Sequence, residues 1–183
     1  MSAISKGYAI NRKDQIGGIN RIWLTTHGSL GTLTVGTNDE ITDATGTATL
    51  FQYDLKNSGN TMVTTANVSR DTGTAFFSTV LSLVLPKLTK EDNKELKLIA
   101  YNRPTIIVED RNGSFLLLGK EHGCELTSAT INTGGALGDA SNYTMEFTCE
   151  EILPPNFITG GTAANPVAGL TNCTETITVG TNS

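Results

Sequence analysis

The pattern of apolar and polar side chains predicts a half-buried strand in the last third of the chain. Between residues 141 and 152, apolar and polar side chains alternate. One face carries Tyr143, Met145, Phe147 and Cys149, and the other carries Asn142, Thr144, Glu146, Thr148 and Glu150. A period of two residues is typical of a strand that packs on a core with one face and meets water with the other.

Residues 74–85 show a different pattern, because apolar side chains occupy both faces. Ala75, Phe77, Leu81, Leu83 and Leu85 share one face, while Phe76, Val80 and Val84 share the other. This predicts a strand that is buried on both sides. We expect a core between two sheets that includes Phe77, Leu81, Leu83, Met145 and Phe147, and we also place Trp23 in the core.

Further strands are predicted at residues 19–26, 47–56 and 60–69. Residues 104–110 and 114–120 flank Arg111-Asn112-Gly113, and an Asn-Gly pair between two apolar runs is a strong hairpin signal. A helix is predicted at 89–101, because Thr89 is a good N-cap and Glu91 and Asp92 place negative charge in the first turn. Leu96, Ile99 and Ala100 form its narrow apolar stripe, and Asn102 and Pro104 end it.

These elements predict a mainly β fold, a two-sheet β-sandwich with one flanking α-helix. The 183 residues suit one ordinary domain, and the 29 Thr, 19 Gly and 15 Asn favour strands and turns. We expect the sandwich domain to span residues 1–153. Residues 154–183 are rich in Gly, Thr and Asn, and they are expected to form an extended arm, a poorly ordered tail or an extra hairpin.

Charge is unevenly distributed within a formal net charge of −5. Residues 1–28 carry four basic groups and one acidic group, and residues 126–183 carry five acidic groups and no basic group. The acidic balance argues against binding nucleic acid through phosphate neutralisation. We expect the basic segment, with Lys6, Arg12, Lys13 and Arg21, to meet acidic surface on a neighbouring copy. That acidic surface comprises Asp139, Glu146, Glu150, Glu151 and Glu175.

Candidate chemical groups form no catalytic, cofactor-binding or metal-binding constellation. His27 and His122 lie outside any ligand spacing, and Ser29 lacks a nucleophile motif. The Gly134–Gly138 loop lacks a phosphate-binding Lys, so we expect a mobile strand connection. The adjacent pairs Asp39-Glu40 and Glu150-Glu151 are expected to be solvated. We therefore expect a protein that is not an enzyme.

The cysteines and the start of the chain bear on where the protein is made. Cys124, Cys149 and Cys173 are an odd number with no metal spacing, so we expect free thiols formed in a reducing cytosol. The first residues lack an apolar run, so no secretory signal is expected. No stretch is long and apolar enough to predict a membrane span.

The order of elements and several phrases resemble the tail tube proteins, or major tail proteins, of tailed bacteriophages. The phrases are KDQIGGINRIWL (13–24), PKLTKEDNKELKLIAYNRP (86–104), EDRNGSFLLLGK (109–120) and ELTSATINTGGALGDASNYTMEFTCEE (125–151). The resemblance covers roughly residues 10–152 and is strongest over 86–151. It implies hexameric rings whose inner sheets join into one barrel, and rings that stack into a hollow tube in the virion tail.

The resemblance also implies partners and a place of assembly. The partners would be further copies of the chain and the tape-measure, tail-terminator and sheath proteins, with DNA passing through transiently and no membrane involved. Assembly would take place in the cytoplasm of the host bacterium. The alternatives are a capsid decoration protein, a head–tail completion protein, or a monomeric β-sandwich binding module for glycans.

One loop is expected to contribute to assembly, and one short sequence pattern occurs twice. Residues 28–48 are polar and Gly-rich, which suits either a surface loop or a long hairpin that reaches the adjacent ring. We expect that deleting 36–46 leaves a folded protein unable to polymerise. Residues 33–38 and 177–182 share the pattern Leu/Ile-Thr-Val-Gly-Thr-Asn, which is either coincidence or a mark of two equivalent edge strands.

Overall fold

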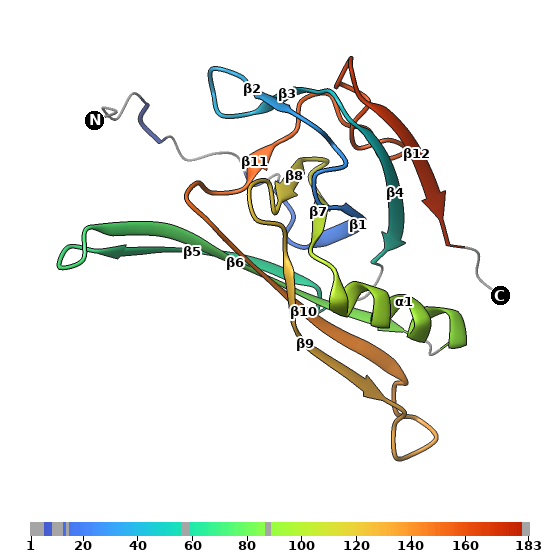
Figure 1. Cartoon of the computed structure of the whole chain (residues 1–183). Helices are drawn as coiled ribbons and strands as arrows, with labels where there is room; N and C mark the ends of the chain where they lie inside the picture. The colour runs from blue at the N-terminus through green and yellow to red at the C-terminus, as the bar shows by residue number, and fades with distance from the viewer. Residues whose placement is uncertain (1–5, 9–12, 14, 56–58, 87–88, 181–183) are drawn as a thin grey trace.

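The computed structural model describes residues 6–8, 13, 15–55, 59–86 and 89–180. In these residues, twelve strands and one helix form a two-layer β-structure with a small additional hairpin (Figure 1). The predicted mainly β, sandwich-like fold with one flanking helix is therefore confirmed. The helix of the described chain is neither long nor apolar enough to span a bilayer.

One layer is a six-stranded sheet in the order β11-β8-β7-β1-β4-β12. Its strands are β1 (Ile19–Thr26), β4 (Thr47–Asp54), β7 (Pro104–Asp110), β8 (Phe115–Leu118), β11 (Asn156–Phe157) and β12 (Thr174–Val179). All neighbouring pairs are antiparallel except β12, which runs parallel to β4. The sequence predicted β1 and β7 with their observed bounds, and it did not predict β11 or β12.

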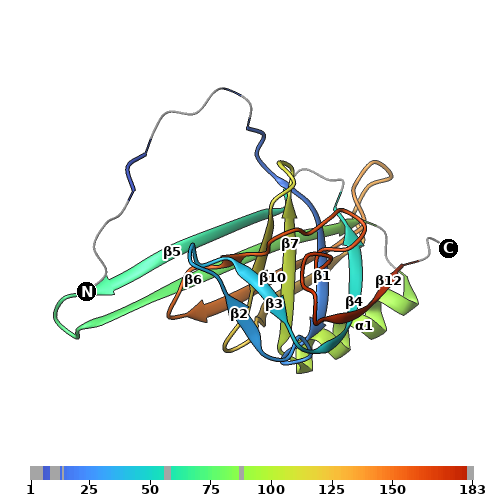
Figure 2. The ribbon, with the colours of Figure 1, turned by 90° about the horizontal axis from the view of Figure 1, so that it is seen from above.

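The other layer is a four-stranded antiparallel sheet in the order β5-β6-β10-β9. Its strands are β5 (Thr61–Ser69), β6 (Thr74–Pro86), β9 (Glu125–Asn132) and β10 (Asn142–Glu151). A separate hairpin pairs β2 (Leu33–Val35) with β3 (Ile41–Ala44). The β5–β6 hairpin is so long that its turn projects past the six-stranded sheet (Figure 1, Figure 2).

The inner core fills the space between the two large sheets. Its members on the six-stranded sheet include Ile22, Leu24, Ile106 and Val108, and those on the four-stranded sheet include Leu81, Leu83, Met145 and Phe147. Four of the five predicted core residues are thus confirmed as buried. The fifth, Phe77, is only half-buried, because it lies where β6 leaves the sandwich and its register partner Glu151 is the last residue of β10.

Burial on both faces occurs in β1 and β7, and not in β6 as the sequence predicted. The first six residues of β7 are all buried. In β6, Phe76 is 37% exposed and Val80 and Val84 are half-buried, so its second face lies at the surface. The six-stranded sheet is packed against other segments of the chain on both faces, whereas the four-stranded sheet packs against the six-stranded sheet with one face only.

An outer core covers the far face of the six-stranded sheet. Trp23, fully buried as predicted, and Leu50 pack there against Ile41 of β3 and against Val167 and Leu170 of the C-terminal segment. Residues 154–180 therefore belong to this sheet and its outer core, where the sequence suggested an arm or an extra hairpin.

Polar contacts also hold the C-terminal segment, residues 154–180, against the rest of the fold. The Asp43 carboxylate accepts hydrogen bonds from the backbone N–H of Asn172, at 3.0 Å, and from the Asn172 side chain. These donors lower the pKa of Asp43. At Gly169, an added Cβ would lie 2.1 Å from the carbonyl oxygen of Thr159, so only glycine fits this close approach.

The helix α1 (Lys90–Tyr101) begins and ends where the sequence predicts. Thr89 is the N-cap, and its hydroxyl oxygen accepts from the backbone N–H of Asp92 at 3.1 Å. Leu96 and Ile99 pack against the inner core while the rest of the helix surface stays in solvent. The helix therefore closes one open flank of the sandwich (Figure 1).

The 28–48 segment is part of the fold, and this corrects the expected effect of deleting 36–46. It does contain a hairpin, but Ile41 and Ala44 are fully buried in the outer core. Ile41 also pairs with Ile158, and its carbonyl accepts from the backbone N–H of Thr159 at 3.0 Å. Deletion would remove these contacts, so it is expected to destabilise the fold as well as any assembly.

Truncating Phe147 to alanine is expected to lower the free energy of unfolding by about 3–5 kcal/mol, because its side chain is 1% exposed within the inner core. The matched change Phe77→Ala is expected to cost less than half as much. Urea unfolding measures both. Equal losses would contradict the placement of Phe77 beyond the end of the sandwich.

Candidate functional site

The outer face of the four-stranded sheet is left uncovered by the described part of the chain. In Figure 1 this sheet is the lower layer, and no described segment lies beneath it. The residues of this face follow from the register: Thr65 pairs with Ser78 and Val63 with Val80, and Val80 in turn pairs with Thr148. Their side chains point away from the inner core.

Hydroxyl groups and carboxylates dominate this open face. Its members are Thr61, Val63, Thr65 and Asn67 of β5; Phe76, Ser78, Val80, Ser82 and Val84 of β6; Thr144, Glu146, Thr148 and Glu150 of β10; and Glu125, Ser128 and Thr130 of β9. None of these positions carries Lys or Arg. The face therefore has a negative charge and many hydroxyl groups, with a few apolar side chains such as Val63 and Val80 between them.

Both edges of this sheet are long, and neither carries lysine or proline; the one irregularity is a β-bulge at Thr127 of β9. In the described structure nothing pairs with the outer side of β5 or β9. β5 contains neither a charged residue nor proline, and β9 carries a single charge, on Glu125. Soluble proteins usually protect such edges with lysine, proline or bulges, since an unprotected edge invites another strand.

The direction of the two edge strands allows one copy to continue the sheet of the next. Four antiparallel strands place β5 and β9 in opposite directions. A rotation about an axis along the strands therefore brings β9 of one copy beside β5 of another in an antiparallel pair. Repeated around the axis, this rotation closes a barrel without edges.

The β9–β10 loop is ordered by its own acidic residue. The Asp139 carboxylate accepts from the backbone N–H groups of Gly135, at 2.9 Å, and Ala136, at 2.8 Å. These two bonds lower the pKa of Asp139. The loop presents Leu137 fully to solvent at one end of the sheet.

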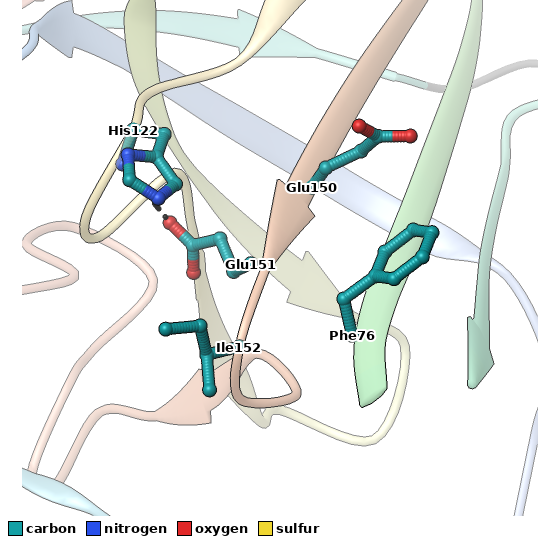
Figure 3. Close-up of a pocket in the computed structure, with 5 residues that line it drawn as sticks. All are labelled: Phe76, His122, Glu150, Glu151 and Ile152. Carbon is teal, nitrogen blue, oxygen red and sulfur yellow. Dashed lines mark hydrogen bonds between the residues drawn. The ribbon is translucent and has the colours of Figure 1, made fainter. Parts of the chain in front are cut away.

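A shallow cleft of about 310 Å³ lies at the opposite end of the sheet, where β10 ends. Phe76, His122, Glu150, Glu151 and Ile152 line it (Figure 3). Glu150 belongs to the open face, while Glu151 points inward and is 8% exposed, so the expectation that both are solvated is wrong for Glu151. The Glu151 carboxylate accepts from the backbone N–H of Glu121 at 2.7 Å.

The other residues considered for chemistry lie apart from one another. His27 Nδ1 is 3.2 Å from the Thr105 hydroxyl, and Ser29 Oγ is 2.7 Å from the Thr25 hydroxyl. At the tip of the β2–β3 hairpin, Glu40 accepts from the backbone N–H of Asn38. Across the described residues, no group of three His, Cys, Asp or Glu side chains is close enough to hold a metal ion.

Of the basic segment expected to meet a neighbouring copy, Arg21 is held within its own chain. Its Nε lies 3.2 Å from Glu109 Oε2 and 3.4 Å from Asp54 Oδ1, and its guanidinium lies over Trp23. Lys6 and Lys13 are exposed, and Arg12 lies outside the described residues. Of the expected acidic surface, Glu146 and Glu150 lie on the open face, whereas Glu175 accepts from the Asn165 side chain.

The two similar hexapeptides contribute edge strands of different kinds. Leu33–Val35 forms β2 in the separate hairpin, while Ile177–Val179 lies in β12 and pairs in parallel with β4. Residues 181 and 182 of the second copy lie outside the described residues. The segments are therefore both edge strands, but in unrelated sheets.

The sequence did not single out the edge strands as functional. The sequence does contain a feature typical of a strand that can pair with another chain, since 61–69 is an uncharged, proline-free stretch with high β-propensity. Which strands are edges depends on pairing between distant segments, and only the fold supplies that.

Comparison with models of known protein families gives no match, and a search of curated proteins gives none either.

The pH dependence of the β9–β10 loop provides a test of its hydrogen bonds. The folded-state pKa of Asp139 lies below its ordinary value of 3.8, so the bonds form fully above that value and are lost as the pH falls through the lowered pKa. NMR titration of the Gly135 and Ala136 amide shifts is expected to show a midpoint below 3.8. In Asp139→Ala both amides should exchange faster, and unchanged exchange would contradict the capping role.

Proposed function

We propose that this chain is the subunit of the tail tube of a tailed bacteriophage. Copies pair edge to edge into rings, and the rings stack into a hollow tube through which the genome is delivered. Hexameric rings follow from the family resemblance in the sequence. The observation that carries the proposal is the pair of long, oppositely directed edges on the four-stranded sheet, neither of which contains lysine or proline.

The open face suits the lining of such a tube. In a closed ring this face would surround the channel, and its charged groups at Glu146 and Glu150 are negative. Like charges discourage the binding of DNA phosphates, and hydroxyl groups give a hydrated surface. Double-stranded DNA could therefore slide along this face without being held.

The rest of the molecule would form the outside of the ring. The six-stranded sheet, covered by the outer core, faces away from the channel and supports the inner sheet. The partners of this proposal are other copies of the chain and the tape-measure, tail-terminator and sheath proteins. The location is the virion tail, assembled in the host bacterial cytoplasm, and no catalytic step is involved.

Edge pairing can be tested with lysine substitutions and matched controls. Thr65→Lys in β5 and Thr130→Lys in β9 place a charge on each edge, where it opposes strand pairing. Ser78→Lys and Thr144→Lys place the same charge on their register partners, one strand further in. We expect the edge variants to stay monomeric while the inner variants assemble like the parent, measured by light scattering and negative-stain microscopy.

The parent protein itself separates the alternatives. Rings or tubes in negative stain are expected. A parent that remains monomeric at every concentration would contradict the proposal, and it would favour a decoration protein or a monomeric binding module. Rings that form equally well in both edge variants would place the subunit contacts elsewhere on the molecule.

A further inference from the structure

Two of the three cysteines lie opposite each other across neighbouring strands. Glu125 of β9 pairs with Thr148 of β10, so the next position of the register places Cys124 opposite Cys149. Directly opposite residues of an antiparallel pair have Cα atoms about 4.5–5.5 Å apart. This separation falls within the range of about 4.4–6.8 Å that a disulfide bridges.

The two thiols are in contact and enclosed. Cys124 is 0% exposed and Cys149 is 5% exposed, and both belong to the inner core. Both are reduced, and their side chains hydrogen-bond to each other. Cys173 is partly exposed and lies in the separate outer core.

A short loop, residues 119–123, leads directly into Cys124, and two side chains of β10 hold it. The Glu151 carboxylate accepts from the backbone N–H of Glu121 at 2.7 Å, and the Cys149 sulfur accepts from the backbone N–H of Gly119. The loop is tight, since a Cβ added at Gly119 would lie 2.7 Å from the carbonyl carbon of Gly123. The cleft lined by His122 and Glu151 lies beside this loop (Figure 3).

The hydrogen bonds make the two sulfur atoms unequal. Cys124 donates to Cys149, which lowers the pKa of Cys149 and raises that of Cys124. Each sulfur also receives one backbone hydrogen bond, Cys149 from Gly119 and Cys124 from Ile106. Cys149 is the more exposed residue of the pair, at 5% against 0% for Cys124, and the thiolate is the reactive form, so we assign Cys149 as the nucleophile and Cys124 as the resolving thiol.

We propose that Cys124 and Cys149 form an oxidation site, at which a peroxide converts the thiol pair into an intrachain disulfide. The inference rests on the geometry of the pair and does not depend on the tail tube proposal.

The reaction balances in two steps. The Cys149 thiolate sulfur attacks one peroxide oxygen, the O–O bond breaks, and a sulfenic acid forms as hydroxide leaves and takes up a proton. The Cys124 sulfur then attacks Cys149 Sγ, the S–S bond forms and the S–O bond breaks, and the second water leaves with the Cys124 proton. The two thiols lose two electrons and two protons, and hydrogen peroxide is reduced to two molecules of water.

The disulfide would fasten the connection between the two sheets. Cys124 lies where the chain passes from β8 of the six-stranded sheet to β9 of the four-stranded sheet, and its backbone N–H bonds to Pro104 of β7 at 2.8 Å. A disulfide from Cys124 to Cys149 of β10 restrains the unfolded chain. It also fixes the start of β9, where the chain arrives from the six-stranded sheet and is bonded to β7. We expect the melting temperature to rise by about 5–10 °C.

The direct test treats the full-length protein with hydrogen peroxide and then blocks the remaining thiols. The expected product carries one blocking group, on Cys173, and is otherwise lower in mass by two hydrogen atoms, with a disulfide-linked Cys124–Cys149 peptide after digestion under non-reducing conditions. The variant Cys173→Ser should give the same disulfide. A product that carries oxidation only at Cys173, or only disulfides between chains, would overturn the proposal.

Two variants test the assigned roles. In Cys124→Ser, the Cys149 sulfenic acid has no resolving thiol and should be trapped by dimedone, whereas Cys149→Ser should give no adduct at position 124. Glu151→Gln weakens the hydrogen bond that holds the 119–123 loop through the backbone N–H of Glu121. Because the loop then opens more easily, disulfide formation should be several-fold faster, and circular dichroism should show an unchanged fold. An unchanged rate in Glu151→Gln together with equal trapping at both cysteines would contradict the mechanism. Assembly of the protein is read separately by microscopy, so failure of one proposal leaves the other intact.

Discussion

Burial of the six-stranded sheet on both faces is the constraint on which the rest of the structure depends. Trp23 and Ile107 face one core, while Ile22 and Ile106 face the other. A sheet enclosed in this way offers no broad surface for interaction. The long four-stranded sheet supplies one wall of the inner core with Leu81 and Phe147, and its second face and both its edges remain open.

An open sheet with two long, unpaired edges is costly for a protein that works alone, since it invites uncontrolled pairing. The six-stranded sheet avoids this at one edge, where β11 is only two residues long and follows two prolines. On the four-stranded sheet, β5 has no such protection and β9 has only the bulge at Thr127. In the ring that we propose, closure would satisfy both edges at once and would turn a hazard of the monomer into the contact that builds the assembly. The same closure would direct Glu146 and Glu150 toward a central channel.

Much of the fold could be predicted from local pattern, as β1, β7, the capped helix after Thr89 and the Asn-Gly hairpin show. The periodic pattern shows which face of a strand carries apolar side chains. It does not show whether another segment of the fold packs against that face. For that reason β6 looked buried on both sides, although Val80 and Val84 face the surface. Strands β11 and β12 follow from packing of a Gly-rich segment on Trp23 and Leu50, and such tertiary contacts leave no periodic signal. Arg21 looked available for a partner, but its ion pair with Glu109 joins neighbouring strands within the chain.

Hydrogen exchange on the dissociated and the assembled protein tests the central claim most directly. If rings form through the four-stranded sheet, the outward-facing backbone amides of β5 and β9 exchange quickly in the monomer and become protected in the assembly. The amides of β12, at the free edge of the other sheet, should change little. Protection that appears at β12, with β5 and β9 still exchanging at the monomer rate, would contradict the account.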